Sequence, residues 1–240
     1  MKLGRKILLM LSAILATTVV AAGIYLTTTY NYATGELSKT FRVSKVTSGN
    51  SKAIQQTKPI TILLMGVDTG SKGRKETWEG NSDTMILVTV NPKTKRTTMT
   101  SLERDLLADV EGSGEAKLNS AYAEGGADLA ISTIQKVLDI DIDYYVKMNF
   151  KGVVDLVEAL GGIDINVEEP WSWYNAGVNY GGKVCEQNSN REFGDKIVCM
   201  DPGFQTLNGE QALAYARNRH QYLGSDLDRI RHQQDVVEAI

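Results

Sequence analysis

A long run without charged side chains near the N-terminus constrains this chain more than any other feature of its sequence. Residues 7–30 contain no Asp, Glu, Lys, Arg or His, and Leu, Ile, Val, Ala and Thr dominate the run. About 20 apolar residues cross a bilayer as a helix, and Lys2, Arg5 and Lys6 precede this run. Positive charge on that side predicts a cytoplasmic tail at residues 1–6 and a single-pass transmembrane anchor at residues 7–30.

A cleavable signal peptide is the alternative explanation of the same run. Residues 20–22 (Val-Ala-Ala) would suit signal peptidase. The apolar character continues past this site through Ile24 and Leu26, which favours an uncleaved anchor. Both alternatives export the rest of the chain. Residues 31–58 are polar and rich in Ser, Thr and Lys, and we predict an extracellular linker there.

The composition is typical of a folded, weakly acidic protein. Hydrophobic residues make up 42% and charged residues 23% of the chain, which is typical of a globular domain. The 26 Lys and Arg residues against 29 Asp and Glu residues give a net charge of −3. This balance argues against a nucleic-acid binder that relies on bulk positive charge, so any anion site must be local.

Apolar patterning predicts one α/β domain with one core over residues 59–240. Ile60 to Met65 is a continuous apolar run, typical of a strand buried on both faces. Further strands are predicted at residues 84–90, 96–102, 144–150 and 163–167, the first two joined as a hairpin by the turn at residues 91–94. Helices are predicted at residues 127–138, 153–160 and 208–215, and from Asp226 or Asp228 to the end. Because the last helix reaches Ile240 without a stop signal, the natural domain is expected to continue.

The two cysteines, Cys185 and Cys199, predict one disulfide. They lie within residues 170–206, a stretch without a clear apolar period that we interpret as a long functional or mobile loop. An oxidising compartment favours their pairing, and closing a loop of about 15 residues stabilises a fold by roughly 3 kcal/mol. Two free thiols are the alternative. The spacing and the lack of histidine partners exclude a zinc or redox CxxC site.

Clustered arginines near the C-terminal end indicate an anion site: Arg217, Arg219, Arg229 and Arg231. The planar guanidinium stays charged and can donate two parallel hydrogen bonds to phosphate or carboxylate. Arg229 and Gln233 share one face of the predicted last helix. Arg231 shares another face with Asp235 and Glu238, so we expect it to form solvated ion pairs. A solubilising helix surface is the alternative for the whole cluster.

Two aspartates bracket the loop between the first two predicted strands. Asp68 follows the first strand and Asp83 precedes the second, so antiparallel pairing would place both carboxylates at one sheet edge. Such a pair suits Mg²⁺, which takes one or two carboxylates and leaves its other positions to water and substrate phosphate. Ordinary turn chemistry is the alternative. Arg104 follows the third strand, near the same edge, and could equally form a surface pair with Asp105.

These residues fall in a series of motifs that resembles the LytR-CpsA-Psr family. The motifs are LLMGVD at residues 63–68, SDTMIL at 82–87, Arg104-Asp105, LNGEQALAYARNR at 207–219 and DRIRHQQ at 228–234. The resemblance spans residues 59–235, and the predicted anchor agrees with the family's architecture. It implies a streptococcal-like, Gram-positive source and a mixed central β-sheet flanked by helices in an α-β-α arrangement.

The resemblance implies an extracytoplasmic phosphotransferase. The family moves a glycopolymer phosphate, such as that of teichoic acid or capsule, from an undecaprenyl-pyrophosphate carrier to a sugar hydroxyl of peptidoglycan. It implies that Asp68 and Asp83 hold Mg²⁺, or Mn²⁺. The residues implied to bind the pyrophosphate are Arg104, Arg217, Arg219 and Arg229, with Gln233 beside them. Asp226 is expected to orient the arginines, the lipid is expected in an apolar channel between sheet and helices, and the two histidines are expected to be bystanders.

One position departs from the family pattern and keeps other functions open. Asn81 stands where the family commonly has arginine, so one phosphate contact is either missing or supplied by Arg74 or Lys75. The alternatives are a non-catalytic protein that binds polyprenyl pyrophosphate or wall polymer, a hydrolase that releases the glycan, and a transcriptional attenuator. The exported topology and the acidic net charge argue against direct contact with DNA.

Overall fold

The structure is a computed structural model, which describes residues 22–28, 44–47, 58–68, 80–172, 174–175, 178–190 and 194–240. The chain divides into two compact units, residues 1–43 and 44–240. In the first unit, residues 22–28 are helical, and the hydroxyls of Thr27 and Thr28 donate hydrogen bonds to backbone carbonyls one turn earlier. The rest of the predicted tail and anchor, and most of the predicted linker, lie outside the described residues. Of the helices that the structure describes, none is long and apolar enough to span a bilayer.

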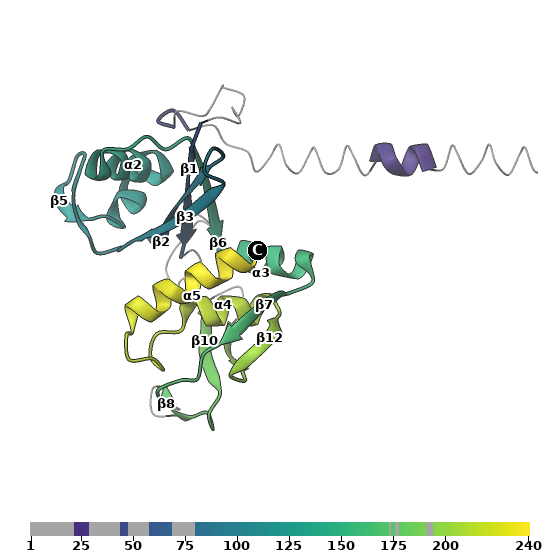
Figure 1. The fold of residues 1–240 in the computed structure, drawn as a ribbon. Coiled ribbons are helices and arrows are strands. Elements are labelled where there is room, and N and C mark those ends of the chain that lie inside the picture. Colours follow the sequence, from purple (N-terminus) through teal and green to yellow (C-terminus); the bar gives the residue numbers. More distant parts are fainter. Residues whose placement is uncertain are drawn as a thin grey trace, which may run out of the picture. The chain divides into compact units, whose positions relative to one another are not determined.

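The second unit contains a four-stranded mixed sheet in the order β3-β2-β1-β6 (Figure 1). Its strands are β1 (Ile60–Val67), β2 (Ser82–Asn91), β3 (Arg96–Leu102) and β6 (Tyr144–Asn149). β1 pairs antiparallel with β2 and parallel with β6, and β2 pairs antiparallel with β3. The predicted mixed sheet and the hairpin are therefore confirmed. In the hairpin turn, Asn91 Oδ1 accepts hydrogen bonds from the backbone N–H groups of Lys93 and Thr94.

The two faces of this sheet have different neighbours. Leu63 and Leu87, paired across β1 and β2, are buried in a cluster with helix α2 (Ser120–Leu138). Leu64 and Ile86, also paired, point the other way toward helices α3 (Phe150–Leu160), α4 (Gly209–Arg217) and α5 (Asp226–Ala239). One face of β1 is therefore packed against the helix α2. The other face lines a pocket, with helices α3, α4 and α5 beyond it.

Local signals explain where the helices begin and end. The Asn149 side chain accepts a hydrogen bond from Gly152 N at 2.8 Å and starts α3, which ends at Gly161 with φ of 82°. Asn208 and Gln211 form the predicted capping box of α4. The helix α2 begins earlier than predicted, because a kink at Gly126 (φ 65°) joins a preceding helical turn to the apolar segment.

The stretch 170–206 is not the irregular loop that the sequence suggested. It contains β8 (Tyr174–Asn175), β9 (Val178–Asn179), β10 (Val184–Asn190), β11 (Gly194–Met200) and β12 (Gly203–Leu207). β10 and β11 form a hairpin in which Cys185 pairs with Cys199 and is joined to it by a disulfide. β12 pairs with β7 (Ile163–Val167). Because these strands form two-stranded ribbons with many polar residues, they show no regular apolar period.

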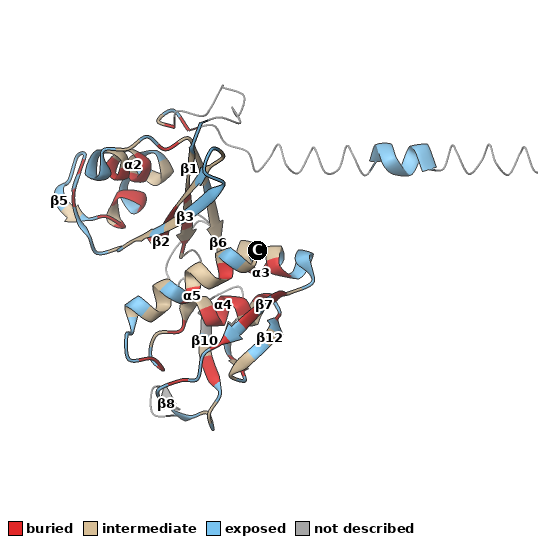
Figure 2. Cartoon of the chain, in the orientation of Figure 1, coloured by how far each residue is buried: buried red, intermediate tan, exposed pale blue. Residues whose placement is uncertain are grey.

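Apolar side chains form two clusters rather than the single core that we predicted. The first surrounds the α2 face of the four-stranded sheet, together with the ribbon of β4 (Leu107–Val110) and β5 (Gly114–Lys117). The second surrounds Tyr215 of α4, and includes Val167 of β7 and Leu207 of β12. Figure 2 shows this second group of buried residues in α4 and β7. The pocket on the second face of the sheet is lined by members of both clusters, Met65 of the first and Val236 of the second.

Candidate active site

An apolar pocket lies between the second face of the sheet and helices α3, α4 and α5. It holds roughly 820 Å³ of space, part of which is open to solvent. The side chains that line it include Leu64, Ile86, Met148, Val153, Leu213 and Val236. Its polar members are Asp68, Asp83, Asn149, Arg217 and Gln233, together with Thr84. The pocket is therefore mostly hydrocarbon, with charged groups gathered where β1 ends and β2 begins.

A β-bulge brings the two aspartates into this pocket. Gly66 pairs with Thr84, but the next residue, Val67, pairs with Ser82, so Asp83 is an extra residue in β2. A bulge re-aims a side chain that strand alternation would point elsewhere. Asp83 and Thr84 accordingly both line the pocket, as does Asp68 after the end of β1.

Gly66 is required by the close approach of these two strands. A Cβ atom at this position would lie 3.0 Å from Thr84 Cβ and 3.2 Å from Thr84 Oγ1. Such contacts are shorter than side chains normally allow, so a larger residue would push β1 and β2 apart at the bulge. The glycine in the LLMGVD motif thus keeps the two aspartates at one sheet edge.

Arg104 is held beside Asp83. Its Nη1 lies 3.4 Å from Asp83 Oδ1 and its Nε lies 3.8 Å from Asp105 Oδ1. Asn119 supports this arrangement from two sides: its backbone N donates to the Arg104 carbonyl at 3.0 Å, and its Nδ2 lies 3.4 Å from Asp83 Oδ1. Sequence reasoning missed Asn119, because its role depends on the turn that brings it back to the end of β3.

Arg229 and Arg219 share a carboxylate. Asp226 Oδ1 lies 3.5 Å from Arg219 Nη1 and 3.5 Å from Arg229 Nη2. The Arg229 side chain is only 12% exposed. Burial lowers the pKa of Arg229, and Asp226 opposes that shift, while the charges of Arg104 and Arg219 add to it. These cations therefore lie within electrostatic range of one another.

Two buried guanidinium nitrogens of this group have no hydrogen-bond acceptor in the part of the chain that the structure describes. They are Nε of Arg104 and Nε of Arg229. Leaving a buried donor without an acceptor costs about 1–3 kcal/mol. Like-charged arginines gathered together also repel one another. Both costs are offset when an anion with several oxygens, such as phosphate, sits among the guanidinium groups.

Arg217 and Gln233 complete the polar end of the pocket. Arg217 is the last residue of α4, and its guanidinium lies 4.6 Å from the centroid of the Phe150 ring at the start of α3. Gln233 lies one turn after Arg229 on α5 and lines the pocket. The structure therefore brings together all of the predicted pyrophosphate-binding residues, either along the pocket or in the adjoining ion pairs.

Other predicted residues lie apart from the pocket. Arg231 forms ion pairs as expected, but with Glu168 at 2.6 Å and Asp228 at 2.9 Å instead of Asp235 and Glu238. The reason is that the exposed side of α5 near Arg231 faces the end of β7, where Glu168 follows the strand. Arg74 and Lys75, the suggested substitutes for the arginine missing at position 81, lie outside the described residues.

His232 has a structural role. It is fully buried, and its ring centroid lies 4.2 Å from that of Tyr215 and 4.6 Å from that of Tyr222. Burial lowers the pKa of His232, which keeps the ring neutral within this aromatic cluster. It does not line the pocket, in agreement with the expectation that it is a bystander.

Glu186 is an acidic residue of the site that sequence reasoning missed. It lies on β10, next to Cys185, and its Oε2 is buried without a hydrogen-bond partner in the described part of the chain. Burial raises the pKa of Glu186 to about 7, although the charges of Arg217 and Arg219 act to lower it. The carboxyl group therefore changes its charge near neutral pH within reach of two arginines of the cluster.

The carboxylate oxygens at the polar end are of the type that hard divalent cations prefer as ligands. Within the described ranges, no group of three or more His, Cys, Asp or Glu side chains forms a complete metal cage. Two carboxylates, Asp68 and Asp83, line the pocket. Mg²⁺ is commonly held by one or two carboxylates, with waters and substrate phosphate as its remaining ligands.

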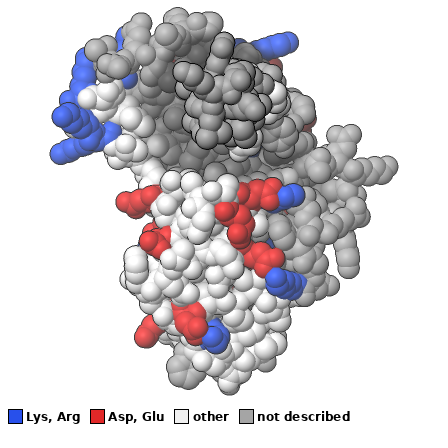
Figure 3. Space-filling view, turned by 90° about the vertical axis from the view of Figure 1, so that its right-hand side faces the viewer, with Lys and Arg blue, Asp and Glu red and all other residues white. Residues whose placement is uncertain are grey.

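The site combines apolar walls with nearby charged side chains. On the face shown in Figure 3, a group of basic side chains lies at the upper left, and acidic side chains predominate on the lower part. Arg217 lines the apolar pocket, and Arg104 is paired with Asp83, which also lines it. A lipid with a phosphate or pyrophosphate headgroup has this combination of properties.

The chain belongs to the LytR_cpsA_psr family, whose model matches residues 23–240. It is 47% identical over 247 residues to biofilm regulatory protein A of Streptococcus mutans serotype c, with 100% of this chain and 57% of that protein covered. It is 37% identical to the polyisoprenyl-teichoic acid–peptidoglycan teichoic acid transferase TagU of Enterococcus faecalis, with 85% of this chain and 60% of that protein covered. The chain thus spans less than two thirds of the length of these relatives.

A solved structure of the family shares the fold. It is that of TagT of B. subtilis with bound octaprenyl pyrophosphate lipid, which has a TM-score of 0.59 and 31% sequence identity. The similarity covers 82% of this chain and 72% of that one. The mixed α/β fold predicted for residues 59–240 is therefore the fold of the LytR-CpsA-Psr proteins.

Proposed function

We propose that this protein is an extracytoplasmic phosphotransferase that moves a glycopolymer phosphate from an undecaprenyl-pyrophosphate carrier to a sugar hydroxyl of peptidoglycan. The observation that carries the proposal is the apolar pocket that ends among two aspartates and a cluster of arginines. A polyprenyl chain fits the apolar part, and a pyrophosphate fits the charged end. In this proposal the chain is anchored by its N-terminal apolar segment, with the catalytic unit outside the cell.

The reaction needs positioning and charge neutralisation more than covalent chemistry. The acceptor hydroxyl oxygen forms a bond to the phosphorus that carries the glycan. The bond from that phosphorus to the bridging oxygen breaks, and polyprenyl phosphate leaves with the proton that the hydroxyl loses. Arg104, Arg217, Arg219 and Arg229 neutralise the charge that develops on the phosphate oxygens. Asp226 holds Arg219 and Arg229 in place, and Gln233 offers a neutral donor beside them.

Asp68 and Asp83 would hold Mg²⁺, or Mn²⁺, in this proposal. When bound, such a cation supplies Lewis-acid stabilisation to the phosphate oxygens. The remaining tasks belong to the protein itself: Gly66 keeps the strands close, Asn119 orients Asp83, and the apolar walls exclude water from the lipid.

Filling the apolar pocket should prevent carrier binding. In Val153→Trp the indole projects from α3 into the pocket, and we expect the affinity for a short-chain polyprenyl pyrophosphate to fall about 10- to 100-fold, from overpacking of about 1–3 kcal/mol. Ala159→Trp places the same side chain on the exposed side of α3 and should leave the affinity unchanged. Isothermal titration with the full chain in lipid nanodiscs measures the affinity of each protein for the polyprenyl pyrophosphate. A transfer assay with both variants follows. Equal affinities of Val153→Trp and the wild type would contradict the pocket as the lipid site.

Carrier affinity should fall as pH rises through about 7. Above that pH Glu186 loses its proton, and its negative charge competes with pyrophosphate for Arg217 and Arg219. We expect a loss of about 1 kcal/mol, roughly fivefold, between pH 6 and pH 8. In Glu186→Gln the part of this loss of carrier affinity that comes from ionisation of Glu186 should disappear. Because the same ligand is titrated against both proteins, its own ionisation cancels in the ratio of the two affinities. A pH profile identical to that of the wild type would show that Glu186 does not contribute.

A further inference from the structure

We infer that Asn218 and Gln221 are positioning residues that fix the directions of Arg217 and Arg219 by tying them to the disulfide-bearing strand β10. The inference deepens the proposed function and rests on it, since the two arginines are assigned there to the pyrophosphate. It is carried by a buried set of hydrogen bonds between the segment after α4 and the strand β10.

Asn218 lies between the two arginines at the point where the chain leaves α4. Its backbone is extended, with φ of −65° and ψ of 128°, so the helix ends there. Its N–H still donates to the carbonyl of Ala214 at 3.0 Å. Arg217 is thus the last helical residue, and Arg219 is the first after the change of direction. The contacts that hold the Asn218 backbone therefore determine the directions in which the side chains of Arg217 and Arg219 extend.

The Asn218 side chain is anchored on β10. Its Nδ2 donates to the Cys185 carbonyl at 2.8 Å and to Gln221 Oε1 at 3.0 Å. Gln221 Oε1 also accepts a hydrogen bond from Cys185 N at 2.7 Å. The backbone N–H and C=O of one residue, Cys185, are therefore both bonded to the segment that carries the arginines. Asn218 and Gln221 are each 0% exposed.

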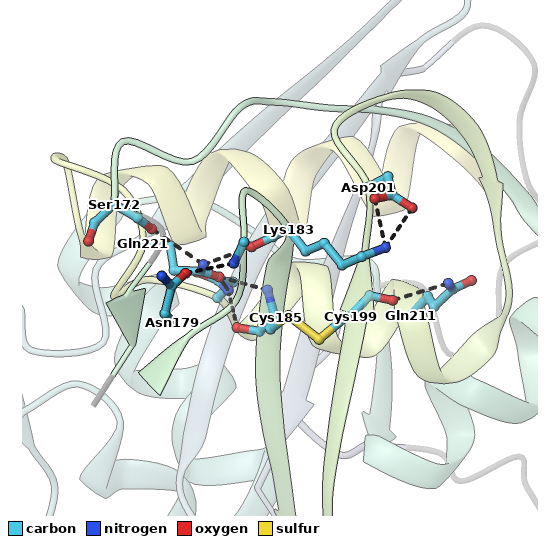
Figure 4. Close-up of a disulfide and its surroundings, with 10 residues drawn as sticks. Ser172, Asn179, Lys183, Cys185, Cys199, Asp201, Gln211 and Gln221 are labelled. Carbon is cyan, nitrogen blue, oxygen red and sulfur yellow. Dashed lines mark hydrogen bonds and ion pairs between the residues drawn. A yellow bond between two sulfur atoms is a disulfide. The ribbon is translucent and has the colours of Figure 1, made fainter. Parts of the chain in front are cut away.

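Gln221 extends this network to two further segments. Its Nε2 donates to the carbonyls of Lys183 at 3.0 Å and Ser172 at 3.3 Å, and Ser172 N donates to the Gln221 carbonyl at 3.1 Å (Figure 4). Residues from β10, from the segment before β8 and from the turn after α4 are therefore joined through one amide. Such buried polar networks specify one arrangement when their members are bonded, and they are costly when a member is removed.

The disulfide restrains the strand β10 on the side that faces β11. Cys185 and Cys199 face each other across β10 and β11, and their sulfur atoms are bonded. Figure 4 shows the disulfide beside Gln221 and Lys183. Because the covalent bond is made by the residue whose backbone holds Asn218 and Gln221, movement of β10 is restrained where the arginine segment is attached. The disulfide therefore acts on the site as well as on the stability of the hairpin.

The test is discrimination between two headgroups. Geometrically placed arginines recognise a pyrophosphate better than a monophosphate, whereas a general loss of stability weakens the binding of both. We compare affinities of the full chain in nanodiscs for farnesyl pyrophosphate and farnesyl phosphate. In Asn218→Ala we expect the ratio of the two affinities to fall about tenfold, because misplacement of binding groups by about 1 Å has effects of this size or larger.

Gln135→Ala is the matched control. Gln135 also holds backbone in place: its Oε1 accepts from Ile142 N at 2.9 Å, but it lies on α2, the helix that packs in the other cluster. It should lose comparable thermal stability and keep the wild-type ratio. If Asn218→Ala does not fold, Gln221→Leu takes its place as the test, because it removes the amide but keeps a similar volume. The ratio of its affinities for farnesyl pyrophosphate and farnesyl phosphate should also fall about tenfold.

The outcomes separate the inference from the proposed function. A wild-type protein that binds neither ligand, or does not prefer the pyrophosphate, would overturn the proposed function. A wild-type preference that survives unchanged in folded Asn218→Ala or Gln221→Leu would overturn the positioning role alone. A loss of preference in the variants but not in Gln135→Ala is the result that the inference predicts.

Discussion

Arg217→Ala is expected to reduce phosphotransfer by about 10²- to 10³-fold, the usual effect of removing one group that stabilises transition-state charge. Arg217 lines the pocket at the end of α4, and its guanidinium is held against the Phe150 ring. The other arginines of the group lie after β3, after α4 and on α5. The rate of product formation from a lipid-linked glycan, measured at saturating carrier, tests this.

Arg231→Ala is the matched control for this variant. Arg231 belongs to the same C-terminal cluster, but it makes half-exposed ion pairs with Glu168 and Asp228. Exposed pairs contribute about 1 kcal/mol or less to stability, and Arg231 is not among the residues that line the pocket. Transfer by Arg231→Ala should stay within about twofold of the wild type on that basis. A similar loss in both variants would mean that general stability, rather than the site, determines the rate.

Asp83→Asn is expected to reduce transfer by about 10²-fold or more and to remove its dependence on Mg²⁺, since a bound metal supplies several kcal/mol of charge stabilisation. The substitution keeps the shape of the side chain but removes the charge that faces Arg104 at 3.4 Å. Rates measured over a Mg²⁺ titration of the wild type and the variant test this. An unaltered Mg²⁺ response in Asp83→Asn would contradict its assignment as a metal ligand.

Asp105→Asn separates the metal from the arginine partner. Asp105 also faces Arg104, at 3.8 Å, and it pairs with Lys117 at 3.2 Å, but its side chain is 48% exposed and does not line the pocket. It should keep the Mg²⁺ response of the wild type. If both aspartates behaved alike, the effect of Asp83 would be explained by its pairing with Arg104, without a metal.

The parts of the fold that the sequence predicts are those with local signals. Three such signals are each contained in a few neighbouring residues, and the structure has all three: the turn after Asn91, the capping box at Asn208 and the helix end at Gly161. The family motifs point to the site residues for the same reason, because each motif is a short segment.

Other features depend on contacts between distant residues. The bulge that turns Asp83 into the pocket arises from the register of β1 against β2, and no residue type marks it. The hairpin β10–β11 was missed because most of β10 is polar and the apolar residues of β11 form one run without alternation. Glu186, Asn218 and Gln221 acquire their importance only when β10 packs against the end of α4. Polar residues in a loop are common, and burial alone distinguishes these from solvated ones.

The identity of the reaction product tests the central claim most directly. The full chain in nanodiscs is incubated with Mg²⁺, a short-chain polyprenyl-pyrophosphate glycan and peptidoglycan fragments in ¹⁸O-labelled water, and the products are analysed by mass spectrometry. The account predicts a glycan joined to the peptidoglycan fragment by a phosphodiester without ¹⁸O, together with an equal amount of polyprenyl phosphate. A glycan phosphate that carries ¹⁸O would identify a hydrolase, and bound carrier without any product would identify a binding protein; either result would contradict the proposed transferase.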